Sequence, residues 1–190
     1  MTVDERSLQM VPGPLPPGVP DPAAGPPITA GLHHANEPLP LDMARDEVRR
    51  RVRRLFRGSF HLRHVDAGSC NGCEAELKAL TGPYYDLHRL GIFVAPSPRH
   101  ADGLIVTGPV TRAMREPLLR TYEAMPDPRL VIAVGACACS GGVFAGCPAV
   151  AGPLERILPV DVFIPGCPPS PLTLLHGLLL ALDRVGEVRR

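Results

Sequence analysis

The 190-residue sequence lacks several features that mark common classes of protein. It has no tryptophan and only 4% aromatic residues, which argues against base stacking or an aromatic cage. It has no excess of one charge, because 20 basic and 19 acidic side chains give a formal net charge of +1. This balance argues against binding to nucleic acid. No apolar run approaches the roughly 20 residues that cross a bilayer. The opening residues, MTVDERSLQM, lack the basic-then-apolar order of a secretory signal.

Proline is abundant instead, and it gathers at the start of the chain. Ten of the 24 prolines lie in the first 41 residues, which include the segment VPGPLPPGVPDPAAGPP. This segment has too little apolar surface to offset the entropy lost on ordering. We therefore predict a disordered, proline-rich tail over residues 1–41. The residues that remain, about 150, are enough for one domain with its own core.

A basic amphipathic helix is predicted over residues 42–58. Val48, Val52, Leu55 and Phe56 are spaced to share one helical face. Acidic residues precede the arginines, as the helix dipole favours. A basic amphipathic helix suits a membrane surface or a groove on a partner. An ordinary solvated helix that caps the core explains the pattern equally well.

Short apolar segments alternate with helical patterns in the rest of the chain. The expected strands are FHLRHV (60–65), ADGLIVTG (101–108), LVIAVG (130–135) and VDVFIPG (160–166), and the expected helices cover 111–124 and 171–185. This alternation predicts an α/β domain over residues 59–190, with a parallel sheet covered on both faces. Ser170 is expected to cap the final helix, with Pro171 in its first turn. Sites in such sheets form just past the carboxyl ends of the strands.

Cysteines follow three of the four predicted strands. Cys70 and Cys73 follow the first strand in GSCNGCE, Cys137 and Cys139 follow the third in GACACSGG, and Cys167 follows the fourth in PGCPPSP. Because parallel strands end at one edge of a sheet, we expect thiols from these loops to converge. With six cysteines and no secretory signal, a metal site is favoured over a disulfide framework. Four converging thiolates suit a soft metal centre.

The cysteine spacing bears on the kind of metal. Structural zinc sites usually take ligands as two close pairs, and only Cys70 and Cys73 form such a pair. Solitary ligands from separate strand ends fit an iron–sulfur cluster, which bridges ligands that lie far apart. The loops are rich in glycine, which lets backbone N–H groups approach sulfur. The spacing alone favours a cluster and leaves zinc and unrelated buried thiols open.

Four segments in order carry a family resemblance: GSCNGCEAELKAL, SPRHADGLIVTGPVTRAM, GACACSGG and VDVFIPGCPPSP. From about Arg45 to Leu182 the sequence resembles the small subunit of membrane-associated [NiFe]-hydrogenases of the formate hydrogenlyase type (group 4). That small subunit is homologous to the 20 kDa [4Fe–4S] subunit of respiratory complex I. In the complex I protein the first two ligands are adjacent, whereas hydrogenases have Cys-x-x-Cys. Cys70 and Cys73 follow the hydrogenase spacing.

The resemblance implies a flavodoxin-like, doubly wound α/β fold that holds one [4Fe–4S] cluster. Carried over residue by residue, it implies Cys70, Cys73, Cys137 and Cys167 as the iron ligands. The implied function is that of an oxidoreductase subunit. It would relay electrons between a ferredoxin-like subunit and the [NiFe] site of a hydrogenase large subunit, without catalysis by the chain alone. The alternative is a quinone-reducing subunit of the complex I kind.

The resemblance also implies partners and a location. The partners are the hydrogenase large subunit, a ferredoxin-like iron–sulfur subunit and integral membrane subunits of the same complex, with no nucleic acid. The chain would be peripheral, on the cytoplasmic face of the inner (cell) membrane. Longer small subunits carry further clusters in a C-terminal extension, so a chain that ends at Arg190 is expected to hold one cluster.

Two cysteines fall outside the implied ligand set. We interpret Cys139 as a small buried residue, with a role as alternative ligand or redox sensor as the other interpretation. Cys147 has no matching ligand position, and we assign it to packing or to an interface.

Some polar residues are further candidates. The resemblance places Glu74 near the active-site interface, where a carboxylate could couple protons to electron transfer. The other interpretation is a residue that favours the dipole of a helix's first turn, and this is the stronger one for Glu76. His61 and His64 are expected to be structural. Candidates for a subunit interface, or for solvated turns, are Arg99, His100 and Arg112.

Overall fold

The computed structural model describes residues 28–29 and 40–188. The disordered tail expected over residues 1–41 therefore lies almost entirely outside the described residues. Ile28 and Thr29, which fall within that range, form strand β1 (Ile28–Thr29) and pair in parallel with a strand near the other end of the chain. The sequence did not predict this strand, because two residues carry no periodicity.

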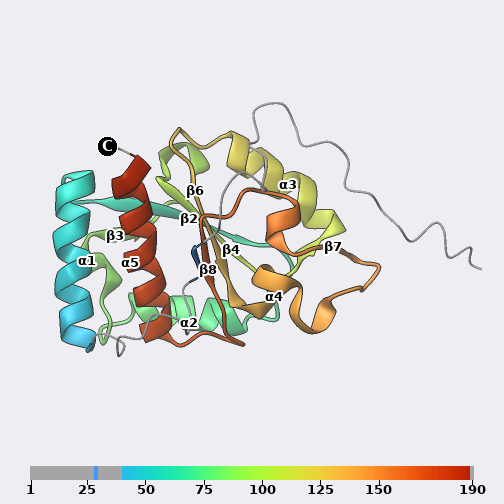
Figure 1. Ribbon diagram of the computed structural model, residues 1–190, viewed down its shortest axis with the longest axis horizontal. Helices are drawn as coiled ribbons and strands as arrows, with labels where there is room; N and C mark the ends of the chain where they lie inside the picture. The colour runs from blue at the N-terminus through green and yellow to red at the C-terminus, as the bar shows by residue number, and fades with distance from the viewer. Residues whose placement is uncertain (1–27, 30–39, 189–190) are drawn as a thin grey trace, which may run out of the picture.

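Six of the described strands form one parallel sheet (Figure 1). From one edge to the other they are β1, β8 (Val162–Ile164), β6 (Leu130–Val134), β4 (Gly103–Thr107), β2 (Phe60–Asp66) and β3 (Ile92–Val94). All neighbouring pairs are parallel. From β3 to β8 the chain order is 2-1-3-4-5, which is the flavodoxin order. The predicted flavodoxin-like, doubly wound fold is therefore confirmed, and β3 is a further strand that the sequence did not predict.

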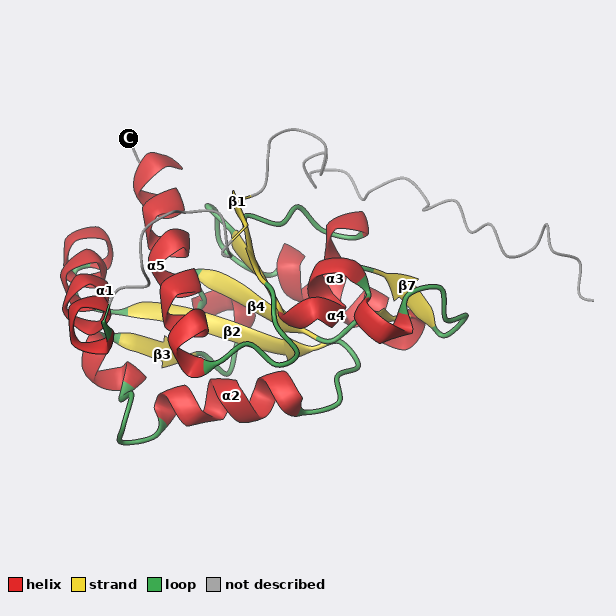
Figure 2. Cartoon of the chain, turned by 60° about the horizontal axis from the view of Figure 1, so that its bottom comes forward, coloured by secondary structure: helices red, strands yellow, loops and turns green. Residues whose placement is uncertain are grey.

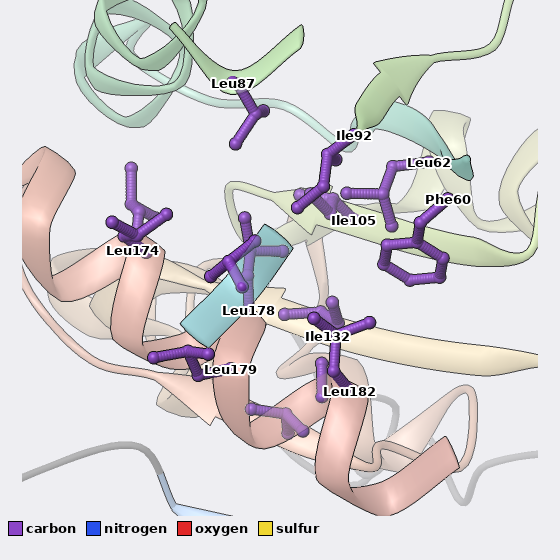
Figure 3. Packing of buried hydrophobic residues seen from close by; sticks show 14 of the residues in the cluster. Phe60, Leu62, Leu87, Ile92, Ile105, Ile132, Leu174, Leu178, Leu179 and Leu182 are labelled. Atoms are coloured by element: carbon purple, nitrogen blue, oxygen red, sulfur yellow. The ribbon is translucent and has the colours of Figure 1, made fainter. Parts of the chain in front are cut away.

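Alternate residues of the central strands face opposite sides of the sheet, so the described core has two layers. In β6, Leu130, Ile132 and Val134 belong to one layer, whereas Val131 and Ala133 belong to the other. Because both faces are covered, this strand is an unbroken apolar run in the sequence. Figure 3 shows the first layer, in which leucines of the last helix face the sheet.

Helices cover both faces of the sheet (Figure 2). Those that contribute to the first core layer are α1 (Leu41–Phe56), α2 (Gly72–Thr81) and α5 (Pro171–Val188). Those that contribute to the second are α3 (Arg112–Glu123) and α4 (Gly135–Ser140). A short antiparallel pair, β5 (Val110–Thr111) and β7 (Val150–Gly152), lies beside α3. Neither strand of this pair was predicted.

Helix α1 uses its apolar face to pack against α5. Its buried residues are Ala44, Val48 and Val52. Arg51 reaches across the contact, where it donates to the Leu179 carbonyl oxygen at 3.1 Å and pairs with Glu47 and Asp183. The apolar stripe is therefore not free to enter a membrane, and the exposed side of α1 is charged.

Helix α5 is apolar on most sides because it lies between the sheet and α1. The Ser170 hydroxyl accepts the Thr173 N–H at 3.3 Å, and Pro171 is the first helical residue, as predicted. Burial of each of the leucines of this helix that lie in the core stabilises the fold by roughly 1.5–3 kcal/mol. Among the described helices, none is long and apolar enough to cross a membrane.

The close approach of α5 to β8 gives a prediction about Gly177. A Cβ added there would collide with the buried side chain of Ile164. Glycine-to-alanine changes inside a helix normally stabilise by up to about 1 kcal/mol. We expect Gly177→Ala to destabilise instead, by about 1–3 kcal/mol, because the core is overpacked. Gly186→Ala in the same helix is the matched control, since its Cβ would meet Leu55 only at 3.7 Å. Urea unfolding of both variants measures the difference, and equal effects would contradict the prediction.

Candidate metal centre

The first pair of cysteines lies at the end of β2, in a loop that side chains and backbone hold in place. The Asp66 Oδ1 atom accepts the N–H groups of Gly68 and Ser69 at 2.8 and 2.7 Å. These bonds keep the pKa of Asp66 below its usual value, although burial acts in the opposite direction. The Ala67 N–H donates to the carbonyl oxygen of Thr107 in the neighbouring strand at 2.9 Å. The loop that leads to Cys70 is therefore fixed to the edge between β2 and β4, where the strand order reverses.

The other two predicted ligands follow β6 and β8 at the same edge. Cys137 lies in α4, directly after β6, and Cys167 lies in the loop between β8 and α5. The Ala136 N–H donates to the Gly166 carbonyl oxygen at 2.7 Å, which joins these two segments. The structure thus brings the three predicted segments together.

Close contacts around glycines show how near the thiols lie to one another's loops. A Cβ on Gly135 would lie 2.5 Å from the Cys73 Sγ atom, and one on Gly142 would lie 3.0 Å from the Cys137 Sγ atom. A Cβ on Gly72 would lie 3.5 Å from the Cys70 Sγ atom and 3.9 Å from Pro168. Glycine at these places leaves room for sulfur. The contacts of Gly135 with Cys73 and of Gly72 with Pro168 link different ligand segments.

The ionisation of the thiols indicates that they share one environment. Burial, followed by the charges of Glu74 and of the other three predicted ligands, raises the pKa of Cys73 to about 11. Burial also raises the pKa of Cys137, followed by the effects of Cys167 and Cys70. Negative charge on the neighbouring groups opposes the ionisation of Cys73 and Cys137, so a cationic centre beside them would stabilise their thiolates.

The donor set fits an iron–sulfur group. It consists of soft sulfur atoms from three separate segments, with Cys70 and Cys167 exposed and Cys73 and Cys137 half-buried. Within residues 28–29 and 40–188, no three His, Cys, Asp or Glu side chains are grouped closely enough for a single metal ion. A cluster spans a wider set of ligands than one ion does, because its own atoms lie between the sulfur ligands.

Cys139 lies on the far side of α4 from Cys137. The sequence led us to expect a glycine-rich loop here, and this was wrong, because Gly135–Ser140 is a helical turn. Residues two apart on a helix differ by about 200° in direction. The Cys139 Sγ atom lies 3.7 Å from the Ala133 carbonyl oxygen and packs against the second core layer. Cys139 is half-buried, and burial raises its pKa to about 12, so we interpret it as a structural thiol.

The remaining candidates are distributed over the surface and the edge of the site. Cys147 is exposed, in the segment that leads to β7. His61 stacks on Phe93, and its backbone N–H donates to Asp102, so it has a structural role. Arg99, His100 and Arg112 are exposed, and Arg112 lines a surface hollow with Gly141 and Cys147.

Glu74 contacts a residue that no sequence pattern links with it. Its carboxylate Oε1 atom lies 3.8 Å from the Nε2 atom of His64, and the same nitrogen lies 2.9 Å from the Thr107 hydroxyl. Burial lowers the pKa of His64, although Glu74 and Asp66 act in the opposite direction. Sequence reasoning missed this contact because it depends on how α2 folds back beside β2.

A family model places the chain among known proteins. Residues 70–181 match the family described as "NADH ubiquinone oxidoreductase, 20 Kd subunit". The matched range begins at Cys70 and includes all four converging thiols. By class, the chain is an iron–sulfur subunit of an oxidoreductase complex. It belongs to the family of the 20 kDa subunit of NADH-ubiquinone oxidoreductase, and this confirms the resemblance seen in the motifs.

Curated relatives include subunits of hydrogenases and of complex I. The chain is 52% identical over 125 residues to the "Probable membrane-bound hydrogenase subunit mbhJ" of Pyrococcus furiosus, covering 66% of this chain and 75% of that protein. It is 46% identical over 145 residues to "Formate hydrogenlyase subunit 7" of Escherichia coli K12, covering 76% of this chain but 57% of that protein. An NADH-quinone oxidoreductase subunit of Geotalea daltonii is 47% identical over 117 residues, which are 62% of this chain and 68% of that protein.

Solved structures support the fold. One chain in the membrane-bound sulfane sulfur reductase, an archaeal respiratory membrane complex, matches with a TM-score of 0.62 and 32% identity, covering 74% of this chain and 77% of that one. A chain in an NAD+-reducing [NiFe]-hydrogenase matches with a TM-score of 0.52 and 20% identity, covering 64% of this chain and 92% of that one. The second likeness bears on the fold alone.

The contact between Gly135 and Cys73 gives a test of the centre. Gly135 has a φ of +88°, and a Cβ there would lie 2.5 Å from the Cys73 Sγ atom. We expect Gly135→Ala to lose most of the bound iron, because the thiol can no longer keep its position. Gly146→Ala is the matched control, since Gly146 has a φ of +79° but nothing within 4 Å of its added Cβ. Iron and acid-labile sulfide in the purified proteins measure the effect. Equal iron in both variants would show that the contact is unimportant.

Proposed function

We propose that the chain holds one [4Fe–4S] cluster and relays single electrons in a membrane-associated [NiFe]-hydrogenase. Its ligands would be Cys70, Cys73, Cys137 and Cys167. The observation that carries the proposal is the convergence of these four thiols, from three strand ends, on one edge of the sheet. When bound, the cluster supplies reversible one-electron chemistry.

The residues of the chain bind the cluster and set its environment. The thiolates hold iron, and the half-buried positions of Cys73 and Cys137 limit water on one side. Glycine backbone next to the sulfur atoms keeps side chains out and leaves N–H groups near them. Burial, hydrogen bonds to sulfur and net charge are the means by which such a site sets its reduction potential.

The exposed side of the centre supports the proposed partners. Cys70 and Cys167 are exposed. Val143 and Phe144, which follow the glycine beside Cys137, are 86% and 40% exposed. Large apolar side chains next to a metal centre are typical of a covered interface. We propose that the hydrogenase large subunit covers this edge and that a ferredoxin-like subunit and integral membrane subunits complete the complex.

The spacing of the first two thiols favours hydrogenase over the alternative function. The alternative is a quinone-reducing role of the complex I kind, in which the same cluster would pass electrons to a quinone. Cys70-Asn71-Gly72-Cys73 has the hydrogenase spacing, whereas the complex I protein has adjacent cysteines. The relatives named above include subunits of both kinds of complex.

Anaerobic purification of the tagged chain from its native membranes tests the proposed function. We expect nickel, iron and acid-labile sulfide to co-purify with the chain, together with hydrogen evolution from a reduced low-potential donor. Iron and sulfide without nickel, together with quinone-linked activity, would favour the alternative function, a quinone-reducing subunit of the complex I kind. Zinc without sulfide would overturn the cluster itself.

The exposed side of α1 gives a proposal about location. We propose that the chain is peripheral, on the cytoplasmic face of the cell membrane, with Arg53 and Arg54 toward anionic lipid. Both are exposed, whereas Arg51 is used within the fold. Each basic residue near such a surface contributes about 1 kcal/mol, and salt screens it.

Charge reversal tests this location. We expect Arg53→Glu with Arg54→Glu to lower the share of the chain that sediments with membranes, with a smaller difference at high salt. Arg51 is left unchanged, because its loss would break the contact with α5. Arg115→Glu with Arg120→Glu in α3 is the control of equal charge. An unchanged share in the α1 variant, or the same fall in both, would exclude this orientation.

A further inference from the structure

A buried hydroxyl, an imidazole and a carboxylate lie in a row beside the candidate centre. Thr107, at the end of β4, is the buried polar residue among the described residues. Its hydroxyl lies 2.9 Å from the Nε2 atom of His64 in the neighbouring strand β2. The same nitrogen is 3.8 Å from the Oε1 atom of Glu74, which directly follows Cys73 in the first turn of α2. The row of Thr107, His64 and Glu74 therefore ends at a carboxylate that directly follows the proposed ligand Cys73 in the sequence.

The Glu74 carboxylate lies in the first turn of α2, where the helix dipole favours negative charge, but the dipole does not account for its burial. Both of its oxygens are shielded from solvent and have no hydrogen-bond partner among the described residues. A glutamate at the third position of a helix often accepts the backbone N–H of the residue before the helix. Here that residue is Asn71, and its N–H donates to the Ser69 hydroxyl at 3.1 Å instead. A shielded carboxylate that accepts no hydrogen bond is costly, so the contact with His64 is the interaction that can offset this cost.

His64 is the group that can hold this carboxylate. The Thr107 hydroxyl fixes the plane of the imidazole ring, and the tautomer with its proton on Nε2 turns an N–H donor toward the side on which Thr107 and Glu74 lie. The Glu76 carboxylate, two residues further along α2, points about 200° away from Glu74. His64 can therefore hold the carboxylate of Glu74 but not that of Glu76.

We propose that His64 is a positioning residue that holds the Glu74 carboxylate beside Cys73, so that its fixed negative charge lowers the reduction potential of the cluster. This inference rests on the proposed function, because it needs the cluster to be present. A negative charge close to the centre opposes the arrival of an electron, and net charge is one of the factors that set such potentials. The contact between His64 and Thr107 joins strands β2 and β4, so the position of the Glu74 carboxylate depends on the fold of the sheet.

Redox titration of the intact membrane complex, followed by electron paramagnetic resonance, tests the inference. We expect Glu74→Gln to raise the midpoint potential, with about a tenfold change in the one-electron equilibrium constant, which is about 59 mV. His64→Leu is expected to shift it in the same direction. The double variant is expected to shift no further than Glu74→Gln alone, because both changes remove one effect.

Three further variants distinguish positioning from a structural role. His64→Gln keeps a donor near the place of Nε2 and is expected to restore most of the wild-type potential. Glu76→Gln removes a charge from the same helix and is expected to leave the potential unchanged. Thr107→Val removes only the hydroxyl bond, and we expect a smaller shift in the same direction as His64→Leu. If the His64→Leu variant binds no cluster, its potential cannot be measured, and Thr107→Val becomes the deciding variant.

The outcomes separate this inference from the proposed function. A full cluster with an unchanged potential in His64→Leu, or shifts of His64→Leu and Glu74→Gln that simply add, would overturn the positioning role. The absence of iron and sulfide from the wild-type complex would overturn the proposed function instead.

Discussion

Three parallel strands must end at one edge of the sheet for Cys70, Cys137 and Cys167 to meet, because these residues lie far apart in the sequence. The continuous register from β2 through β4 and β6 to β8 fixes this alignment. Backbone bonds then join the segments beyond the strands, from Ala67 to Thr107 and from Ala136 to Gly166. The site therefore depends on the sheet as a whole, and an error of register in one strand would move one ligand away from the others.

The two core layers keep this register. The first layer needs α5, whose leucines fill the space over β6 and β8. A helix that is apolar on most sides must be covered on its outer side as well. Helix α1 supplies that cover, and Arg51 joins the two helices through the Leu179 carbonyl oxygen. The basic helix is thus first a structural element, and only its remaining arginines are available to a membrane or a partner.

The sequence predicted the long elements well and the short ones poorly. The expected strands at 60–65 and 130–135 match β2 and β6 closely, since buried parallel strands are unbroken apolar runs. Strands β1, β3, β5 and β7 have two or three residues, too few for a period, whereas β8, also of three residues, lies within a longer apolar segment that marks it. Helix α4 consists of Gly, Ala, Cys and Ser, a composition that resembles a loop. The four proposed ligands were taken from the family motifs and stay a prediction, whereas spacing alone left zinc open. The contact of His64 with Glu74 was beyond prediction, because it joins a strand to a helix through side-chain directions.

The exposed thiols explain why one fold can serve complexes with different electron acceptors. Cys73 and Cys137 are half-buried within the chain, but Cys70 and Cys167 lie at its surface. Part of the environment of the proposed cluster must therefore come from whichever subunit covers this edge. Burial and net charge set the potential of such a centre, so a covering subunit tunes it without any change in the ligands. On the positioning role proposed above, the chain contributes the charge of Glu74, which His64 and Thr107 hold in place. The partner would then decide the acceptor, while the α/β fold and the four-thiol edge remain the same.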